Sequence, residues 1–325
     1  MVAATPCWAS AAPDDVRGDC STDQQREAAA AYPPADPETF ARFSAYLAGR
    51  YRSGLAAYEV WNEPDQRNEL YFAGPDKPAR YAALLKATYP AVKAAAPKVP
   101  VLGGAIVGSN GAFLQALYDN GIKGSYDALS VHYYDLVLSS LKQIHAVQVH
   151  NHDRKPLWLA ETGWSSCAPA KLQDGQVCVS RSTQARNLAD LYQAVRRTSW
   201  LRAMTVFSIS DTSQYDLGLY DGKGHAKPAA AALRRAFKSR KRKLRALTLH
   251  ARSSRGTVRA SGSGPAGDVY TLEVSVRGTL RYRLNFRLGS TNRYSLRLPA
   301  ALGSHALKLR VSSMWDGRSV TRRLR

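Results

Sequence analysis

The order of apolar and polar positions changes once along the chain, near residue 238. Before this point, short apolar runs that end in polar residues or glycine alternate with helix-like segments. Runs of this kind are typical of buried parallel strands. They lie at 99–108, 126–134, 156–164 and 203–210. The alternation predicts a parallel α/β fold.

The segments between the apolar runs have helical spacing and helical end signals. Helices are expected at 37–51, 76–97, 111–121, 182–198 and 228–238. Gly121 is expected to cap the end of the third helix, and Ser182 to open the fourth. Residues 1–6 predict a strand stub. The stretch that follows, up to residue 36, is expected to be a polar loop.

After a basic stretch at 238–245, apolar residues recur with period two, and glycine, serine and asparagine separate the runs. This pattern is typical of antiparallel sheet. Strands are expected at 244–253, 256–264, 269–278, 280–289, 293–300 and 305–313. We therefore expect a small β-sandwich. The chain would then have two domains, with residues 1–238 as the α/β domain and residues 239–325 as a basic linker and β-sandwich-like domain.

The net charge of +21 is concentrated in the β-rich region. From Arg240 onward, 20 Lys and Arg face 3 Asp and Glu, a balance of +17, whereas residues 1–239 have 26 against 22, a balance of +4. Such a surface attracts anionic polymers. No recognition helix or nucleic-acid motif is visible, so the sequence favours an anionic glycan and predicts no nucleic-acid partner. A domain without a specific partner stays an alternative.

The four cysteines form two local pairs, Cys7 with Cys20 and Cys167 with Cys178. Neither pair has the C-x2-C spacing of a zinc site. Each would close a short polar loop, as surface disulfides of exported proteins do, although four free thiols are the alternative. Disulfides would favour an extracellular or cell-wall-associated protein. No apolar run approaches the ~18 residues of a membrane span, and no signal peptide is visible after Met1.

Two glutamates follow strand-like apolar runs in a similar way. Glu63 stands in YEVWNEP (58–64) and Glu161 in LWLAETGW (157–164). The strands of a parallel barrel end at one mouth, so two such acids can face each other across a cleft. Paired carboxylates are the chemistry of glycoside hydrolysis, in which one protonates the leaving oxygen and the other attacks the anomeric carbon or activates water.

The motifs WNEP and ETGW resemble those of clan A glycoside hydrolases, the retaining (β/α)8-barrel enzymes that include families 5 and 39. The resemblance begins at TPCWAS (5–10) and includes YDLGLYDGKGHAKPA (215–229), after the last strand. It implies that Glu63 is the general acid/base, that Glu161 is the nucleophile and that Asn62 bonds the sugar 2-hydroxyl. In retaining enzymes the two carboxyl groups lie about 5–5.5 Å apart.

The same resemblance implies further substrate-binding residues. His132 and Tyr134 lie two apart on a predicted strand, so their side chains share a face. In the clan, a His-x-Tyr pair lines the sugar subsite and the Tyr contacts the nucleophile. Trp8 resembles a strand 3 residue that stacks on sugar, and Trp164 could form a subsite wall. For all four side chains, packing in the interior is the alternative.

Three histidines in HAVQVHNH (145–152) raise the question of a metal site. The spacing of His145, His150 and His152 matches no standard ligand pattern. A solvated polar helix end is the favoured interpretation. The sequence therefore predicts neither a metal nor another cofactor.

The chain departs from the clan in two respects. The last strand, MTVFSISD (204–211), offers Phe207 where the clan has a tryptophan. A full barrel takes about 250 residues, but only 57 residues precede Tyr58, on the strand that corresponds to the fourth. We therefore expect an incomplete (β/α)8 TIM barrel with about strands 3–8, and a functional protein in which Met1 is not the true start.

Together these patterns predict a secreted, retaining β-glycosidase that acts on a polysaccharide or an oligosaccharide. The rival hypothesis is a non-catalytic glycan-binding or cell-wall-associated protein with a degenerate barrel. A nucleic-acid-binding protein that uses the basic region is a weaker alternative.

Overall fold

The computed structural model describes residues 1–66, 68–107, 111–134, 139–167, 172–173, 176–239, 246–254, 256–264, 269–288, 293–302, 305–313 and 318–324. The chain divides into two compact units. The first comprises Met1–Tyr133, Ser140–Thr162 and Ser199–Val206, and the second comprises Tyr134–Ser139, Gly163–Thr198 and Phe207–Arg325. The domain boundary near residue 238 stays a prediction, and most of the basic stretch 238–245 lies outside the described residues.

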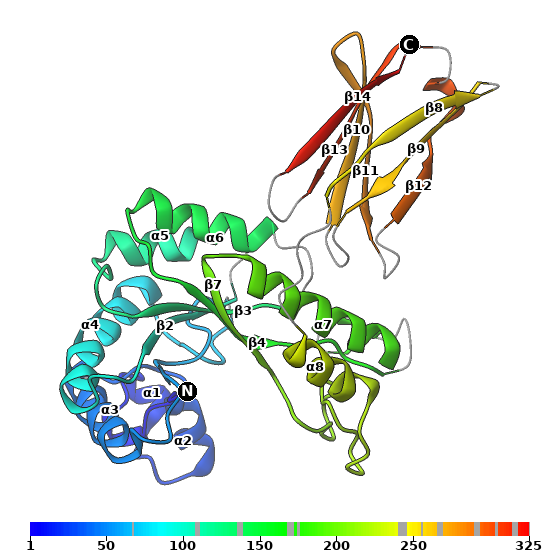
Figure 1. The fold of residues 1–325 in the computed structure, drawn as a ribbon. Coiled ribbons are helices and arrows are strands. Elements are labelled where there is room, and N and C mark those ends of the chain that lie inside the picture. The colour runs from blue at the N-terminus through cyan, green and yellow to red at the C-terminus, as the bar shows by residue number, and fades with distance from the viewer. Residues whose placement is uncertain are drawn as a thin grey trace. The chain divides into compact units, whose positions relative to one another are not determined.

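A parallel sheet of five strands lies in the first unit (Figure 1). Its order is β1-β2-β3-β4-β7, where β1 is Tyr58–Glu59, β2 Val101–Ile106, β3 Ala128–His132, β4 Leu157–Thr162 and β7 Leu201–Val206. Val2 pairs in parallel with Val60, which places the predicted stub beside the end of β1. The predicted parallel strands are confirmed, and they form an incomplete (β/α)8 barrel.

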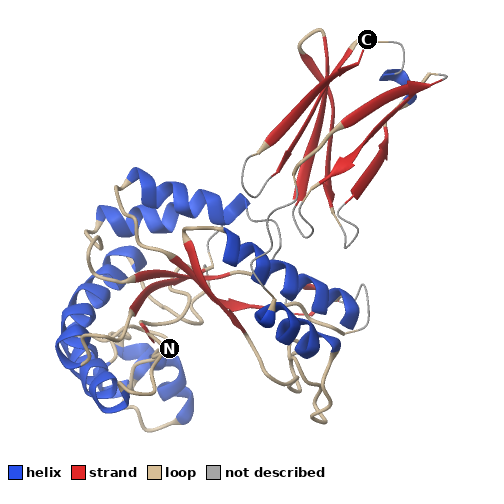
Figure 2. Cartoon of the chain, in the orientation of Figure 1, coloured by secondary structure: helices blue, strands red, loops and turns tan. Residues whose placement is uncertain are grey.

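The apolar runs become strands because helices cover them. All residues of β2 and β3 are buried, as in parallel strands covered on both faces. The longer helices of this unit include α3 (Pro37–Tyr51), α4 (Lys77–Ala95), α5 (Ala112–Asp119) and α6 (Ser139–His150) (Figure 2). On α4, the buried Tyr81 hydroxyl donates to the Val60 carbonyl at 2.8 Å and accepts from the Gly104 N–H at 2.8 Å. Tyr81 thereby ties the chain after β1 to β2.

The stretch that was expected to be a polar loop contains helices, so this prediction is wrong. It forms a short 3-10 turn η1 (Cys7–Ala9) and the helices α1 (Asp14–Arg17) and α2 (Asp23–Ala30). The start of α2 is fixed by a capping box between Thr22 and Gln25, which satisfies two backbone donors reciprocally. The polar composition of α2 hid it, since Ala29 is its one buried residue.

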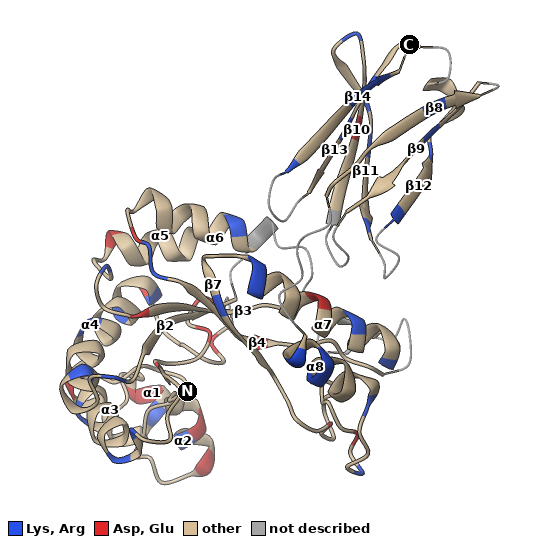
Figure 3. Ribbon diagram, in the orientation of Figure 1, with Lys and Arg blue, Asp and Glu red and all other residues tan. Residues whose placement is uncertain are grey.

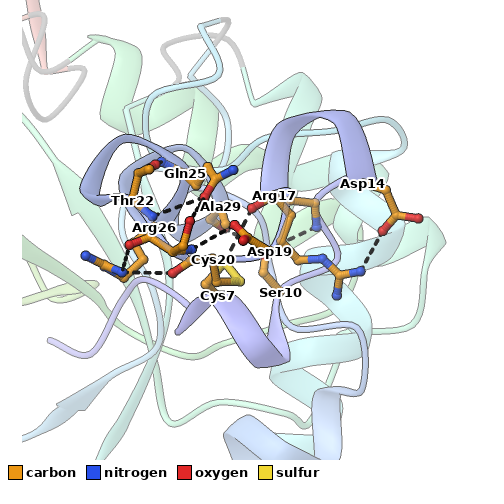
Figure 4. The surroundings of a disulfide bond; sticks show 12 residues. Cys7, Ser10, Asp14, Arg17, Asp19, Cys20, Thr22, Gln25, Arg26 and Ala29 are labelled. Atoms are coloured by element: carbon orange, nitrogen blue, oxygen red, sulfur yellow. Dashed lines mark hydrogen bonds and ion pairs between the residues drawn. A yellow bond between two sulfur atoms is a disulfide. The ribbon is translucent and has the colours of Figure 1, made fainter.

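The predicted disulfide between Cys7 and Cys20 fastens this region (Figure 4). The guanidinium of Arg26, on α2, donates to the carbonyl oxygens of Cys20 at 2.8 Å and Ser21 at 2.9 Å. The disulfide and the helix therefore hold each other in place.

The second unit contains the helices α7 (Arg181–Arg197) and α8 (Pro228–Lys238) and the short strands β5 (Leu172–Gln173) and β6 (Gln176–Val177). The second predicted disulfide, Cys167–Cys178, is confirmed. The N-cap of α7 is Ser180, whose hydroxyl accepts from the Thr183 N–H at 3.1 Å. The prediction that Ser182 opens this helix is therefore wrong by two residues.

The β-rich region forms two antiparallel sheets, as predicted. One has the order β11-β10-β13-β14 and the other β12-β9-β8. The strands are β8 His250–Ser254, β9 Thr257–Ser263, β10 Val269–Val276, β11 Thr279–Arg287, β12 Arg293–Arg297, β13 Leu307–Ser313 and β14 Ser319–Leu324. Apolar residues from both sheets share one core. β14 was not predicted, because basic residues occupy much of it and weaken its alternation.

Candidate active site

Glu63 lies just beyond β1, in a turn that the interior holds in an unusual backbone conformation. Trp61 and Glu63 have positive φ angles of 69° and 44°, which cost about 1–3 kcal/mol each and persist only where the surroundings impose them. Trp61 is fully buried, contacts the rings of Phe40 and Phe72, and donates its indole N–H to the Tyr71 carbonyl at 2.7 Å. The buried indole therefore fixes the turn from which Glu63 projects.

Sheet register brings His132 and Glu161 together from neighbouring strands. His132 ends β3 and is paired with Glu161 of β4 in the parallel ladder. The Tyr133 N–H donates to the Glu161 carbonyl at 2.8 Å, just past the end of β3. The carboxyl ends of parallel strands meet at the same edge of a sheet, so both side chains lie at the edge where Glu63 lies.

The two glutamates converge on one imidazole nitrogen. Nδ1 of His132 lies 2.7 Å from Oε1 of Glu63 and 3.3 Å from Oε2 of Glu161. One carboxylate oxygen from each glutamate and one nitrogen of His132 lie within 4.8 Å of one another. The His132 side chain is fully buried, whereas that of Glu161 is 19% exposed. The predicted catalytic pair is thus brought together at a partly accessible point.

A third glutamate, which the sequence analysis missed, lies on the other side of the same ring. Oε1 of Glu59 is 4.0 Å from Nε2 of His132. The hydroxyl of Ser130, on β3, donates a short hydrogen bond to the Glu59 carboxylate. An acid in a buried strand is rare unless it is paired, and Glu59 stands in a run of this kind, so the signal was present in the sequence.

These carboxylates change the protonation of His132. Burial lowers the pKa of His132, but the hydrogen bond to Glu63 and the charges of the three glutamates outweigh burial, and the pKa is raised above its usual value. An opposite charge a few ångströms away stabilises the charged form in this way. The charged imidazolium is therefore favoured more strongly than in a free histidine.

Two polar side chains from the same turn complete the surroundings of Glu63. The Gln66 amide donates a short hydrogen bond to Oε2 of Glu63; the sequence analysis gave no signal for it. Oδ1 of Asn62 is buried and has no hydrogen-bond partner among the described residues. A buried acceptor without a partner is costly, and the role of Asn62 toward the sugar stays a prediction.

Comparison with known families agrees with this geometry. Residues 46–232, more than half of the chain, match the family model described as the glycosyl hydrolase catalytic core. The chain belongs to this family. It is a glycosidase by family, and the expectation of a clan A glycoside hydrolase is confirmed. No curated protein matches the chain significantly.

Similar solved structures are glycoside hydrolases. A GH39 β-xylosidase from Caulobacter crescentus is 15% identical, with 83% of this chain and 71% of that chain covered and a TM-score of 0.50. A GH39 enzyme from Xanthomonas axonopodis pv. citri is 16% identical, with 83% and 72% covered and a TM-score of 0.49. A GH128 endo-β-1,3-glucanase from Amycolatopsis mediterranei is 19% identical, with 59% and 77% covered and a TM-score of 0.44. At these identities, the similarity to the β-xylosidase shows the fold alone.

Tyr134, Trp164 and Trp8 were also predicted to bind the substrate of this glycosidase. Tyr134 lies beyond the end of β3, in the second unit, where its ring contacts Phe207 at 6.1 Å between centroids; Phe207 in turn contacts Tyr215 at 6.1 Å. Trp164 also belongs to the second unit and is buried. Trp8, in the first unit, is 73% exposed. The substrate-binding roles of Tyr134, Trp164 and Trp8 stay predictions.

Glu63, His132 and Glu161 also have the donor set of a metal site. In the part of the chain that the structure describes, they are the group of His, Cys, Asp and Glu that could hold a metal ion, and the histidines of 145–152 form no such group. A histidine must be neutral at the ligating nitrogen. The raised pKa of His132 and its bond to Glu63 favour a proton at Nδ1 instead, so this site suits acid–base chemistry better than metal binding.

Proposed function

We propose that the chain is a retaining β-glycoside hydrolase that acts on O-glycosidic bonds of a polysaccharide or oligosaccharide. Glu161 is the nucleophile and Glu63 is the general acid/base. The observation that supports this best is the separation of the two carboxylates, whose nearer oxygens lie within 4.8 Å. Retaining enzymes have carboxyl groups about 5–5.5 Å apart, whereas inverting enzymes leave about 6.5–9.5 Å for a water molecule.

The reaction has two displacement steps. In the first, a Glu161 oxygen attacks the anomeric carbon while the glycosidic C–O bond breaks, and Glu63 gives its proton to the departing oxygen. In the second, Glu63 takes a proton from water, the water oxygen bonds to the anomeric carbon, and the bond to Glu161 breaks. His132 contacts both acids, so it holds the carboxyl groups of Glu63 and Glu161 toward the same point.

Substrate contacts follow from the polar and aromatic side chains described above. The unpartnered Oδ1 of Asn62 accepts a hydrogen bond from a sugar hydroxyl, which the clan resemblance assigns to the 2-hydroxyl. The rings of Tyr134 and Phe207 offer apolar faces on which a sugar can stack, with Trp164 and Trp8 as further walls. Phe207 is 42% exposed and takes the part of the tryptophan that the clan has on its last strand.

The disulfides and the basic region indicate where the glycosidase acts. Two disulfides are present, which suits an oxidising, extracellular environment. None of the helices within the described ranges is long and apolar enough to cross a membrane. The balance of +17 from Arg240 onward suits a cell-wall or extracellular glycan with negative charges.

Hydrolysis of a panel of aryl β-glycosides and β-linked glycans tests this proposal. Glu161→Ala should lower kcat by at least about 10³-fold, because the nucleophile is lost. Glu63→Ala should slow glycosides with poor leaving groups most, since these need a proton. The exposed Glu27 gives the matched control Glu27→Ala, which should match the wild type. Unimpaired turnover by Glu161→Ala would overturn the mechanism, and glycan binding without any turnover would favour the non-catalytic alternative.

A further inference from the structure

The outer face of the sheet β12-β9-β8 presents three arginines in one row. Arg252 of β8 lies directly opposite Arg259 of β9, and Arg259 lies directly opposite Arg297 of β12. All three side chains are exposed. Directly opposite residues of antiparallel strands have Cβ atoms about 4.5–5.5 Å apart, and like charges in such pairs are destabilising. The row therefore concentrates positive charge at a cost in stability.

The adjacent positions of this face carry hydroxyl groups and further basic groups. One row along, His250 lies opposite Ser261, which lies opposite Ser295. In the next row, Ser263 lies opposite Arg293. These five residues border a shallow hollow of ≈ 550 Å³. The face thus offers a continuous strip of guanidinium, imidazole and hydroxyl donors.

Within the described residues, no carboxylate forms an ion pair with any arginine of this face. Arg259 donates to the Ser295 hydroxyl at 3.1 Å, and Arg297 to the Thr257 hydroxyl at 3.5 Å. These neutral acceptors leave the positive charges uncompensated. An anion supplied from outside the chain would compensate them.

The other sheet of this region is built differently. There Glu273 of β10 lies opposite Arg283 of β11 and opposite Arg310 of β13, and Arg283 donates to Glu273 at 2.7 Å. Figure 3 shows this acidic position on β10 in red, and basic positions on β9 and β12 in blue. Both outer faces have arginines at every second position. An ion pair with Glu273 compensates an arginine on this sheet, whereas the arginines of the sheet β12-β9-β8 have no such pair among the described residues.

We propose that the face formed by Arg252, Arg259, Arg297 and the adjoining hollow binds a carboxylate-bearing polysaccharide, of the uronic acid class. Guanidinium groups bind carboxylates through paired hydrogen bonds, and serine hydroxyls and His250 suit sugar hydroxyl groups. The choice of a glycan rests on the proposed function, whereas the anionic character of the ligand rests on the face itself.

Nucleic acid fits this face less well. Proteins that bind single strands stack the bases on exposed aromatic side chains, whereas Tyr294, the aromatic residue of β12 that borders the hollow, is only 7% exposed and packs in the core. Duplex readers place a helix or a strand ribbon in a groove, whereas this face is a three-stranded sheet.

The test compares two triple variants of the full chain that remove the same charge. Arg252→Gln, Arg259→Gln and Arg297→Gln together alter the proposed face. Arg281→Gln, Lys308→Gln and Arg323→Gln together alter exposed positions of the other sheet. Binding to polygalacturonate, to a neutral β-glucan and to single-stranded DNA is measured at two salt concentrations. The arginine-row triple should weaken polygalacturonate binding at least about 10-fold, since three charge-assisted contacts are lost, and the control triple less than about 3-fold.

Several outcomes would overturn the proposal: equal losses in the two triples, salt-insensitive binding to neutral glucan, or tighter binding to DNA than to polygalacturonate. The single variant Arg259→Gln guards against misfolding, because relief of like-charge repulsion should leave its melting temperature unchanged or raise it. Hydrolysis of aryl β-glycosides should be equal in both triples. An inactive wild type that still binds polygalacturonate through the arginine row would overturn the proposed function and leave the binding face intact.

Discussion

Nδ1 of His132 lies 2.7 Å from the carboxylate of Glu63 and 3.3 Å from the carboxylate of Glu161. The imidazole ring therefore contacts both acids of the proposed mechanism. Glu59 faces its opposite edge. A buried imidazole among three carboxylates has consequences for the pH dependence, the stability and the activity of the protein.

The stability of the first unit should fall with rising pH because of His132. The pKa of His132 is raised in the folded protein. Its ion pairs therefore stabilise the folded state fully below about pH 6.5, which is the usual pKa of a histidine in the unfolded chain. The stabilisation is lost as pH rises through the raised pKa. His132→Asn should flatten this fall in the free energy of unfolding, measured between pH 5.5 and 9, whereas His150→Asn, at an exposed position, should not. An unchanged pH profile in His132→Asn would contradict the assignment.

Glu59 should act as a positioning residue for His132. Glu59→Gln keeps an acceptor for the Ser130 hydroxyl but removes the negative charge that faces Nε2. The pKa of His132 should then fall, and kcat should fall by about 10-fold as the ring loses its orientation. NMR titration of the imidazole and the pH profile of kcat measure both effects. A lower melting temperature with an unshifted profile would show a merely structural role; Glu38→Gln, at an exposed site, is the control.

Chelators and zinc should have different effects on the enzyme. EDTA should leave hydrolysis unchanged, since the proposed reaction uses protons at Glu63 and Glu161. Added Zn²⁺ should inhibit competitively, because these acids and His132 offer three ligand atoms within 4.8 Å. Inhibition should strengthen as pH rises, since a ligating histidine must lose its proton. Loss of activity in EDTA that Zn²⁺ restores would instead indicate a metalloenzyme.

A buried ion pair should be important for the stability of the second unit. Nζ of Lys227 lies 2.5 Å from Asp211 and donates to the Ser166 hydroxyl at 2.8 Å, and its side chain is fully buried. Lys227→Ala leaves Asp211 buried without its partner and should cost about 3–5 kcal/mol. Thermal melting compares it with Lys223→Ala, at an exposed position, which should change little. Equal melting temperatures for the two variants would contradict this role.

Much of the fold could be predicted because each barrel strand is a short apolar run. The register of β3 and β4, which places Glu161 beside His132, was not predicted, since the resemblance implied only a contact between Tyr134 and the nucleophile. What could not be predicted depends on contacts distant in sequence. The left-handed turn at Trp61 and Glu63 is imposed by packing against Phe40 and Phe72, and no local pattern encodes it.

The missed elements have a common physical cause. α2 and β14 bury few side chains and are rich in polar or basic residues, so neither gives a clear period. Glu59 was missed for a different reason. It stands inside an apolar run and was taken as an ordinary strand residue, although a buried acid requires a partner. Its partners, Ser130 and His132, lie on another strand.

Covalent trapping of the nucleophile tests whether Glu161 attacks the anomeric carbon. The full chain is incubated with a panel of 2,4-dinitrophenyl 2-deoxy-2-fluoro-β-glycosides, whose glycosyl-enzymes break down slowly, and labelled peptides are mapped by mass spectrometry. A sugar ester on Glu161 is expected, with Glu63 unmodified. A label on any other residue, or a first-formed product of inverted anomeric configuration from a substrate that is turned over, would contradict it.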